Sequence, residues 1–272
     1  IFGGDIEPNT GDVYGQEEYY LNLYSSKYLD YVKYIGDVFP VRGNHDFLIH
    51  GVQDGESSNW LSMPHKYVYN YLARNIERYA ITHPNKNYYY LDNVAQRIRI
   101  IILDEYETYS TTGVHNVLDD TQMEWLIEDA LNVENYSVVV VSHQSFDSQQ
   151  EYYDSAFTPI QDLMIAIKNK QSYVYNTFYK DYTDTTIDMV CHISGHTHYD
   201  YFTVDNGLLT ISTVCDAFYA YTDPHITRTR GTVTECAFDV FSIDTDNKTI
   251  KTVRIGGGAD RAWNYLDGSV IL

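Results

Sequence analysis

The chain has 272 residues, 44% of them hydrophobic, and its 38 acidic side chains against 18 basic ones give a net charge of −20. That length suits one large α/β domain or two small ones, and no apolar run reaches the ~18 residues that a membrane-spanning helix needs. The acidic charge argues against binding to a nucleic-acid backbone, which requires a basic surface. A small phosphorylated substrate stays compatible with it, because a bound metal can reverse the local field.

In chain order, the first half predicts strands that alternate with helices. The patterns indicate a strand ending at residue 4, a helix over 16–35, a short strand over 37–41, a helix over 66–80, and strands over 88–92 and 97–104. Asp119 or Asp120 can cap the following helix, "TQMEWLIEDALN". The apolar run 137–143 is typical of a strand that is covered on both faces.

In the second half, strands become more frequent. Residues 159–172 predict a helix and 187–196 a buried strand. Two hairpins follow, one turning at Asn206-Gly207, the strongest short hairpin signal, and one at Asp244–Asn247. We therefore expect an α/β fold in a single domain, residues 1–272, in which two sheets face each other with helices outside.

The three cysteines, Cys191, Cys215 and Cys236, show neither a disulfide framework nor a zinc-knuckle spacing. Cys191 and Cys236 stand in apolar, strand-like runs, so both are predicted to be buried thiols. Unpaired thiols favour a reducing compartment such as the cytoplasm.

Four predicted strand ends carry polar side chains that can bind a metal ion. They are Asp5 after "IFGG", Asn44-His45-Asp46 after "VFPVRG", His143 after "VVVVS", and His196 and His198 around Thr197. A strand holds its last residue rigidly, and a neighbouring glycine lets backbone approach an ion closely. In extended backbone, His196 and His198 would point the same way. Oxygen and imidazole ligands together suit Mn, Fe or Zn rather than Ca or Cu(I).

The series "GGD", "GNHD", "SH" and "GHTH", in that order, resembles the calcineurin-like metallophosphoesterase family over nearly the whole chain. The resemblance implies a four-layer α/β/β/α sandwich of two mixed sheets, here lacking its first strand, with two metal ions at one end. It also implies a ligand for each position. Asp5 bridges both ions; Asn44, His143 and His196 complete the second site; and His198 belongs to the first.

The resemblance implies hydrolysis of phosphate mono- or diesters. A water that bridges two divalent cations loses a proton near neutral pH and attacks phosphorus in line, while the cations neutralise charge on the phosphoryl oxygens. His45 would assist the leaving group, and Asp46 would raise the pKa of that imidazole and fix its tautomer. The natural substrate, the choice between mono- and diesters, and the oligomeric state stay open.

One part of the family pattern is missing. The pattern begins with Asp-x-His on an earlier strand, but only four residues precede Asp5. The first site would then keep two protein ligands, where three is the usual number for a catalytic ion. We expect the natural chain to extend upstream of Ile1. The alternative is a non-catalytic binding or assembly module on the same fold with an incomplete metal site, and the retained His45–Asp46 pair argues against it.

Three further residues are candidates for substrate binding: His225, Arg228 and Arg230, in "DPHITRTRGT". An arginine there can clamp a phosphate with two hydrogen bonds. The alternative, surface arginines that pair with the abundant acidic side chains, stays open. His192 lies four residues before His196 in the same apolar run, and we expect it deeper, in the core.

Overall fold

The structure is a computed structural model, and it describes the following residues: 39–43, 48–51, 59–62, 80–82, 86–106, 118–150, 153, 155–216 and 225–272. The predicted elements over 1–4 and 16–35, and nearly all of the helix over 66–80, lie outside them. The chain divides into two compact units, which are treated separately below. The first comprises Ile1–Asp92, Ile100–Leu131 and Val141–His143; the second comprises Asn93–Arg99, Asn132–Val140 and Gln144–Leu272.

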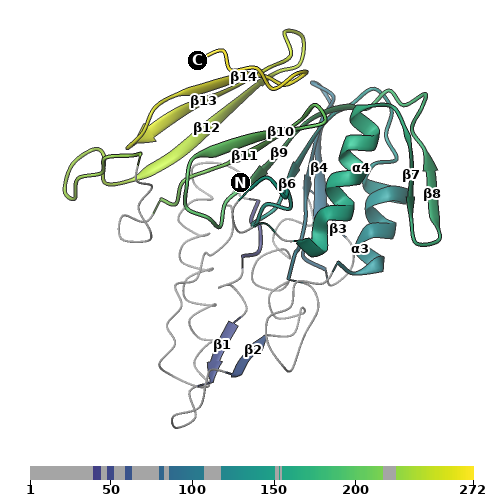
Figure 1. Cartoon of the computed structure of the whole chain (residues 1–272), viewed down its shortest axis with the longest axis horizontal. Coiled ribbons are helices and arrows are strands. Elements are labelled where there is room, and N and C mark those ends of the chain that lie inside the picture. Colours follow the sequence, from purple (N-terminus) through teal and green to yellow (C-terminus); the bar gives the residue numbers. More distant parts are fainter. Residues whose placement is uncertain are drawn as a thin grey trace. The chain divides into compact units, whose positions relative to one another are not determined.

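The described elements follow one another along the chain, and Figure 1 labels most of them. They are β1 (Leu48–Gly51), β2 (Asn59–Ser62), β3 (Ile81–Thr82), β4 (Tyr89–Asn93), β5 (Ile98–Ile102), α3 (Asp120–Trp125), η2 (Leu126–Ala130), β6 (Ser137–Val141), η3 (Ser155–Phe157), α4 (Thr158–Lys168), β7 (Ser172–Tyr175), β8 (Phe178–Asp181), β9 (Asp188–Ser194), β10 (Tyr201–Asp205), β11 (Leu208–Ser212), β12 (Ala237–Asp244), β13 (Thr249–Gly256) and β14 (Arg261–Asn264).

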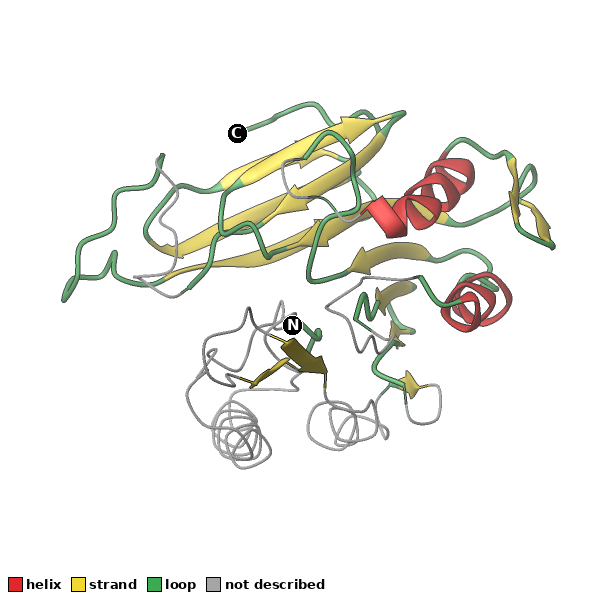
Figure 2. Cartoon of the chain, turned by 60° about the horizontal axis from the view of Figure 1, so that its bottom comes forward, coloured by secondary structure: helices red, strands yellow, loops and turns green. Residues whose placement is uncertain are grey.

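Strands, yellow in Figure 2, outnumber helices in the described part of the chain. The largest sheet has seven strands in the order β10-β11-β9-β6-β5-β4-β3, and a separate sheet has the order β12-β13-β14. In the large sheet β9 and β11 run parallel, whereas β10 and β11 run antiparallel. The mixed α/β fold class with few helices in the described part is therefore confirmed.

Most described elements match the sequence prediction. Strands β4, β5, β6 and β9, helix α4 and both C-terminal hairpins lie where they were expected, with ends that differ by a few residues. Asp119 is the residue that caps α3, because its side chain accepts a hydrogen bond from Thr121 N at 2.9 Å. The turn at Asn206-Gly207 has φ values of 47° and 84°, the left-handed pair that a tight hairpin requires.

The predicted strand over 37–41 is wrong in its described part. Within residues 39–43 only Pro40 forms a bridge, and the neighbours on both sides are irregular. Proline has no N–H to donate to a strand ladder, so a continuous strand is unfavourable there. The Pro40 carbonyl instead accepts a hydrogen bond from the Tyr89 hydroxyl at 2.6 Å.

In the second unit, α4 packs on β9 and β11 and supplies the core. Its Ile160, Leu163, Met164 and Ile167 are fully or almost fully buried, as are the residues of β11. A helix with one apolar face over an apolar strand pair buries side chains that would cost about 1.5–3 kcal/mol each if exposed. This packing fixes the position of β9, the strand that leads into "GHTH".

The β12-β13-β14 sheet is attached to the same unit by polar and aromatic contacts. The Tyr265 hydroxyl and the Lys248 ammonium both bond to Asp188, at 2.8 and 2.9 Å. Phe202 of β10 meets Trp263 of β14 edge to face, with ring centroids 5.5 Å apart. The sheet therefore joins the first residue of β9 at one point and β10 at another.

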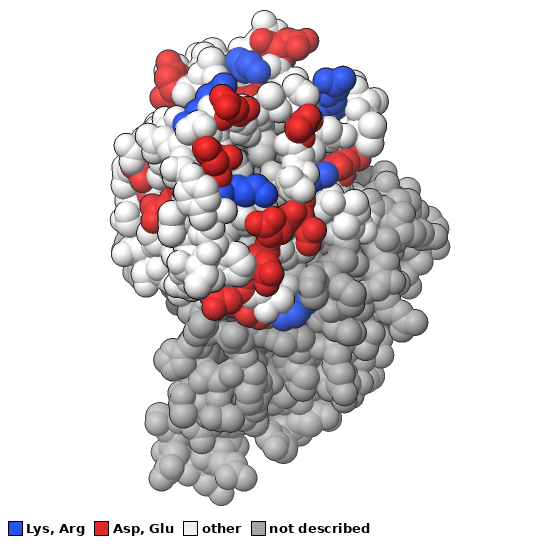
Figure 3. Space-filling model, turned by 90° about the vertical axis from the view of Figure 1, so that its right-hand side faces the viewer, with Lys and Arg blue, Asp and Glu red and all other residues white. Residues whose placement is uncertain are grey.

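The surface follows the composition. Figure 3 shows acidic side chains interspersed with basic ones on the described face. In the part of the chain that the structure describes, no helix has the length and apolar character needed to cross a membrane. None of the three cysteines, all of them among the described residues, forms a disulfide. Cys191 is buried, as expected, but Cys236 is exposed, so that prediction is wrong; β12 begins only at the next residue, Ala237.

Candidate metal centre

The "GHTH" segment is a tight loop rather than the end of a strand. Strand β9 stops at Ser194, and Thr197 N donates to Gly195 O at 2.7 Å across a three-residue turn. His196 and His198 have φ values of 63° and 62°. The expectation that extended backbone aims both imidazoles the same way is therefore wrong. Left-handed backbone is uncommon outside glycine and persists where the surrounding structure imposes it, often at functional sites.

A buried hydroxyl network holds the start of this loop. The hydroxyls of Ser194 and Ser212 lie 2.9 Å apart, and Ser212 Oγ donates to Gln150 Oε1 at 2.8 Å. All three side chains are buried. Thr213 N also donates to Ser194 O at 3.0 Å. The loop therefore leaves β9 from a point that β11 fixes through side chain and backbone.

A buried charge network holds the end of the loop. Asp200, two residues after His198, accepts two hydrogen bonds from Arg254 Nη2, at 2.7 and 2.6 Å. Arg254 also donates to both oxygens of Asp239, at 3.0 Å each, and its side chain is only 1% exposed. Arg261 pairs with Asp239 at 2.7 Å and with Asp200 at 3.3 Å.

These four charges balance, with two arginines against two aspartates, as a buried cluster must. Burial alone would lower the pKa of Arg254, but the hydrogen bonds and charges of Asp239 and Asp200 outweigh that effect and raise it. The cluster therefore ties the "GHTH" loop to β12 and β13.

His143 follows β6 and belongs to the first unit. Its side chain is buried, with 2% of the residue exposed, and its ring centroid lies 6.1 Å from that of Tyr106. Because His143 belongs to the first unit and His196 and His198 to the second, their convergence on one ion stays a prediction.

A second buried ion pair in the first unit lies directly before the "GNHD" segment. Arg42 Nη1 pairs with Asp104 Oδ2 at 3.0 Å, and Asn87 Nδ2 donates to the same oxygen at 3.2 Å. Tyr106 N donates to the other oxygen at 3.0 Å. The Gln122 side-chain amide makes two hydrogen bonds to the Asp104 backbone: it accepts one from the N–H at 2.9 Å and donates one to the carbonyl at 2.8 Å. The network fixes the residue that precedes Gly43 and the "GNHD" segment.

Comparison with known protein families identifies one family that the chain matches. Its residues 1–200 match the calcineurin-like phosphoesterases. The chain belongs to the calcineurin-like phosphoesterase family. Members of this family are phosphoesterases that generally use divalent metal ions, although some members are inactive. No curated protein matches the chain.

The match spans every predicted metal ligand of this phosphoesterase-family chain, from Asp5 to His198, and also His45 and Asp46. Asp5, Asn44, His45 and Asp46 lie outside the described residues. Among the residues that are described, no three His, Cys, Asp or Glu side chains gather closely enough to hold an ion. The described ligands are three imidazoles, and this donor type fits the Mn, Fe or Zn ions that the resemblance implies.

Asp104 is the residue that sequence reasoning missed. It ends the run "RIRIIILD" just after β5, so it repeats the pattern of a polar side chain at a strand end on which the other candidates were chosen. Nothing in the sequence pairs it with Arg42, which lies 62 residues earlier.

The three substrate-binding candidates lie beyond the family match, and their roles stay predictions. Arg228 donates to backbone carbonyls, with Nε bonded to Glu235 O at 2.9 Å and Nη1 to Cys215 O at 2.7 Å. Its guanidinium is thus used within its own loop. Arg230 and His225 are exposed.

His192 lies in the core, as predicted. It is completely buried and stacks on Phe146, with ring centroids 3.9 Å apart and planes 12° apart. Burial lowers its pKa to about 3, so the imidazole is neutral at physiological pH.

Proposed function

We propose that this chain is a metal-dependent hydrolase of phosphate mono- or diesters with a binuclear metal centre. The observation that carries the proposal is the family match, which includes all five predicted ligands and the His45–Asp46 pair. In this proposal residues 1–272 form one domain with the four-layer α/β/β/α arrangement, and the ligands gather at one end of it.

Five side chains would hold the ions. Asp5 would be shared, Asn44, His143 and His196 would serve one ion, and His198 the other. Two divalent cations bound there would supply a hydroxide nucleophile at neutral pH and neutralise charge on the phosphoryl oxygens. The chain's contribution is to hold neutral imidazoles in fixed positions, since a protonated imidazole cannot ligate. The hydroxyl and charge networks around "GHTH" support that role for His196 and His198.

The leaving group would depend on His45. In the proposed mechanism its imidazolium donates a proton to the departing oxygen, and Asp46 holds the ring and favours the charged form. The segment that carries both begins at Arg42, which the Asp104 network holds in place. The proposed substrate is a small phosphorylated molecule, because the net charge of −20 disfavours a polyanionic backbone.

The test uses purified protein loaded in turn with Mn, Fe and Zn, and two aryl esters, p-nitrophenyl phosphate and bis(p-nitrophenyl) phosphate. His45→Ala should lower turnover by about 10²–10⁴-fold with bound metal unchanged. His196→Ala should lower the bound metal itself. His115→Ala, a histidine outside the four motifs, serves as the control. Bound metal without hydrolysis of either ester would contradict the proposal and favour the binding module.

A further inference from the structure

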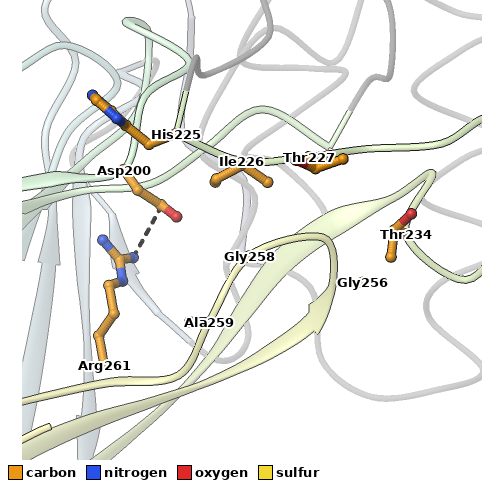
Figure 4. Close-up of a pocket in the computed structure, with 9 residues that line it drawn as sticks. All are labelled: Asp200, His225, Ile226, Thr227, Thr234, Gly256, Gly258, Ala259 and Arg261. Atoms are coloured by element: carbon orange, nitrogen blue, oxygen red, sulfur yellow. Dashed lines mark ion pairs between the residues drawn. The ribbon is translucent and has the colours of Figure 1, made fainter.

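A cavity of about 480 Å³ lies in the second unit, at the end of the "GHTH" loop (Figure 4). One wall is Asp200, which follows His198 by two residues. Since consecutive Cα atoms are 3.8 Å apart, the Cα atoms of His198 and Asp200 are separated by at most about 7.6 Å. The cavity therefore begins next to a predicted metal ligand.

The walls of the cavity are fixed in place. In Figure 4 the Asp200 carboxylate points towards Arg261, and the two form an ion pair at 3.3 Å. A further part of the lining is the turn between β13 and β14, which leads into Arg261 (Figure 4). A Cβ on Gly256 would lie 1.9 Å from Cys236 O, and one on Gly258 would lie 2.3 Å from Arg254 Nη1. Both glycines have left-handed φ values, 97° and 111°. Only glycine fits there, so this turn packs tightly on the charge network.

The lining suits an uncharged organic group. Its one carboxylate, Asp200, and its one guanidinium, Arg261, pair with each other, so the guanidinium is already used within the lining; the one other titratable side chain there is His225. Ile226, Ala259 and the glycines give apolar surface, and the hydroxyls of Thr227 and Thr234 can hydrogen-bond. A volume of this size, with apolar walls and a few polar groups, is typical of small-molecule sites.

We propose that this cavity binds the uncharged, ring-sized organic group of the phosphoester substrate, while its phosphoryl group lies at the predicted metal ligands. The inference rests on the proposed function and narrows the substrate class. It favours esters of small, neutral alcohols, whose organic group matches the volume of this open cavity. It also gives the segment His225–Thr227, in which His225 and Thr227 are exposed, a role as one wall of the substrate site.

The test fills the cavity and compares a small ester with a large one. Ala259→Trp adds a ring to the lining, with Ala259→Leu as a milder version; Ala95→Trp, on the exposed turn between β4 and β5, is the matched control. The substrates are methyl phosphate and 1-naphthyl phosphate, and kcat/KM of each variant is compared with that of the wild type. We expect Ala259→Trp to lower kcat/KM at least tenfold for 1-naphthyl phosphate and less than threefold for methyl phosphate, and Ala95→Trp to leave both values unchanged.

Equal losses with both esters, or no loss with either, would overturn the proposal. Calorimetric titration with 1-naphthol separates it from the proposed function, because binding needs no turnover. Naphthol binding to the wild type and not to Ala259→Trp would support the cavity even if no ester were hydrolysed. No naphthol binding to the metal-loaded wild type would overturn the cavity assignment and leave the hydrolase proposal standing.

Discussion

Arg254 should contribute more to stability than any surface ion pair, because the structure buries it among two carboxylates. Its side chain is 1% exposed, as is that of Asp239, and Asp200 is 14% exposed. Replacing Arg254 by Met removes four hydrogen bonds to these carboxylates and one to Gly257 O. Arg261 would then be the one cation left in the cluster against two buried anions.

The magnitude follows from that uncompensated charge. Removing one partner of a buried ion pair costs about 3–5 kcal/mol, whereas an exposed pair contributes about 0–1 kcal/mol. Since domains of this kind have total free energies of unfolding of about 5–15 kcal/mol, Arg254→Met should remove roughly a fifth or more of the stability. Arg254→Lys keeps the charge but not the planar fork, so its loss should be intermediate.

The assay is urea unfolding followed by circular dichroism, in the presence of EDTA so that metal binding adds nothing to the native state. Lys251→Met is the matched control, since Lys251 is an exposed cation on the same strand and should change the free energy of unfolding by less than about 0.5 kcal/mol. If Arg254→Met lowered the free energy of unfolding by less than about 1 kcal/mol, the cluster would be solvated. It could then not hold the "GHTH" loop rigidly.

Three other outcomes are expected. Asp104→Asn should lower the free energy of unfolding by about 3–5 kcal/mol, because it removes the negative charge from a buried ion pair with Arg42; a change near zero would contradict this. Burial raises the pKa of Cys191 to about 12, so at pH 8 a thiol reagent should modify exposed Cys236 in the native protein and Cys191 only after unfolding, as peptide mapping would show. Burial lowers the pKa of His192 to about 3 from an ordinary 6.5, so the unfolded chain binds a proton that the folded chain does not. Stability should therefore fall as the pH drops from 6.5 towards 3, by up to about 1.4 kcal/mol per pH unit, and His192→Phe should flatten that slope in denaturant titrations at several pH values.

Local patterns were sufficient to predict several of the strands and turns, but not short strands such as β7 and β8. The run "SVVVV" can be buried on both faces only as an inner strand, and β6 is buried at every position. Asn206-Gly207 predicts a hairpin because both residues tolerate positive φ, and the turn lies there. The same local reasoning fails at Pro40 and Cys236, where the apolar neighbours predict a strand and the structure has none.

The sequence predicts which residues form the candidate site, but it does not predict their geometry. Period-two reasoning needs extended backbone, and the loop after β9 is left-handed at His196 and His198. The residues next to "GHTH" do not predict this left-handed backbone, because the partners that hold the loop come from distant positions in the chain. Ser212 lies 18 residues after Ser194, and Arg254 lies 54 residues after Asp200. Such pairings depend on strand order, which a single sequence does not reveal.

The two networks give a physical reason for the backbone of this loop. Left-handed backbone costs about 1–2 kcal/mol for a residue with a Cβ, so two such residues would relax in an unsupported loop. The hydroxyls at Ser194 fix where the loop starts, and the Asp200 carboxylate fixes where it ends. With both ends held, relaxing either histidine would break hydrogen bonds that are buried, and breaking each costs about 1–3 kcal/mol. The left-handed conformation then has the lower free energy. The orientation of the two imidazoles therefore depends on the charge network.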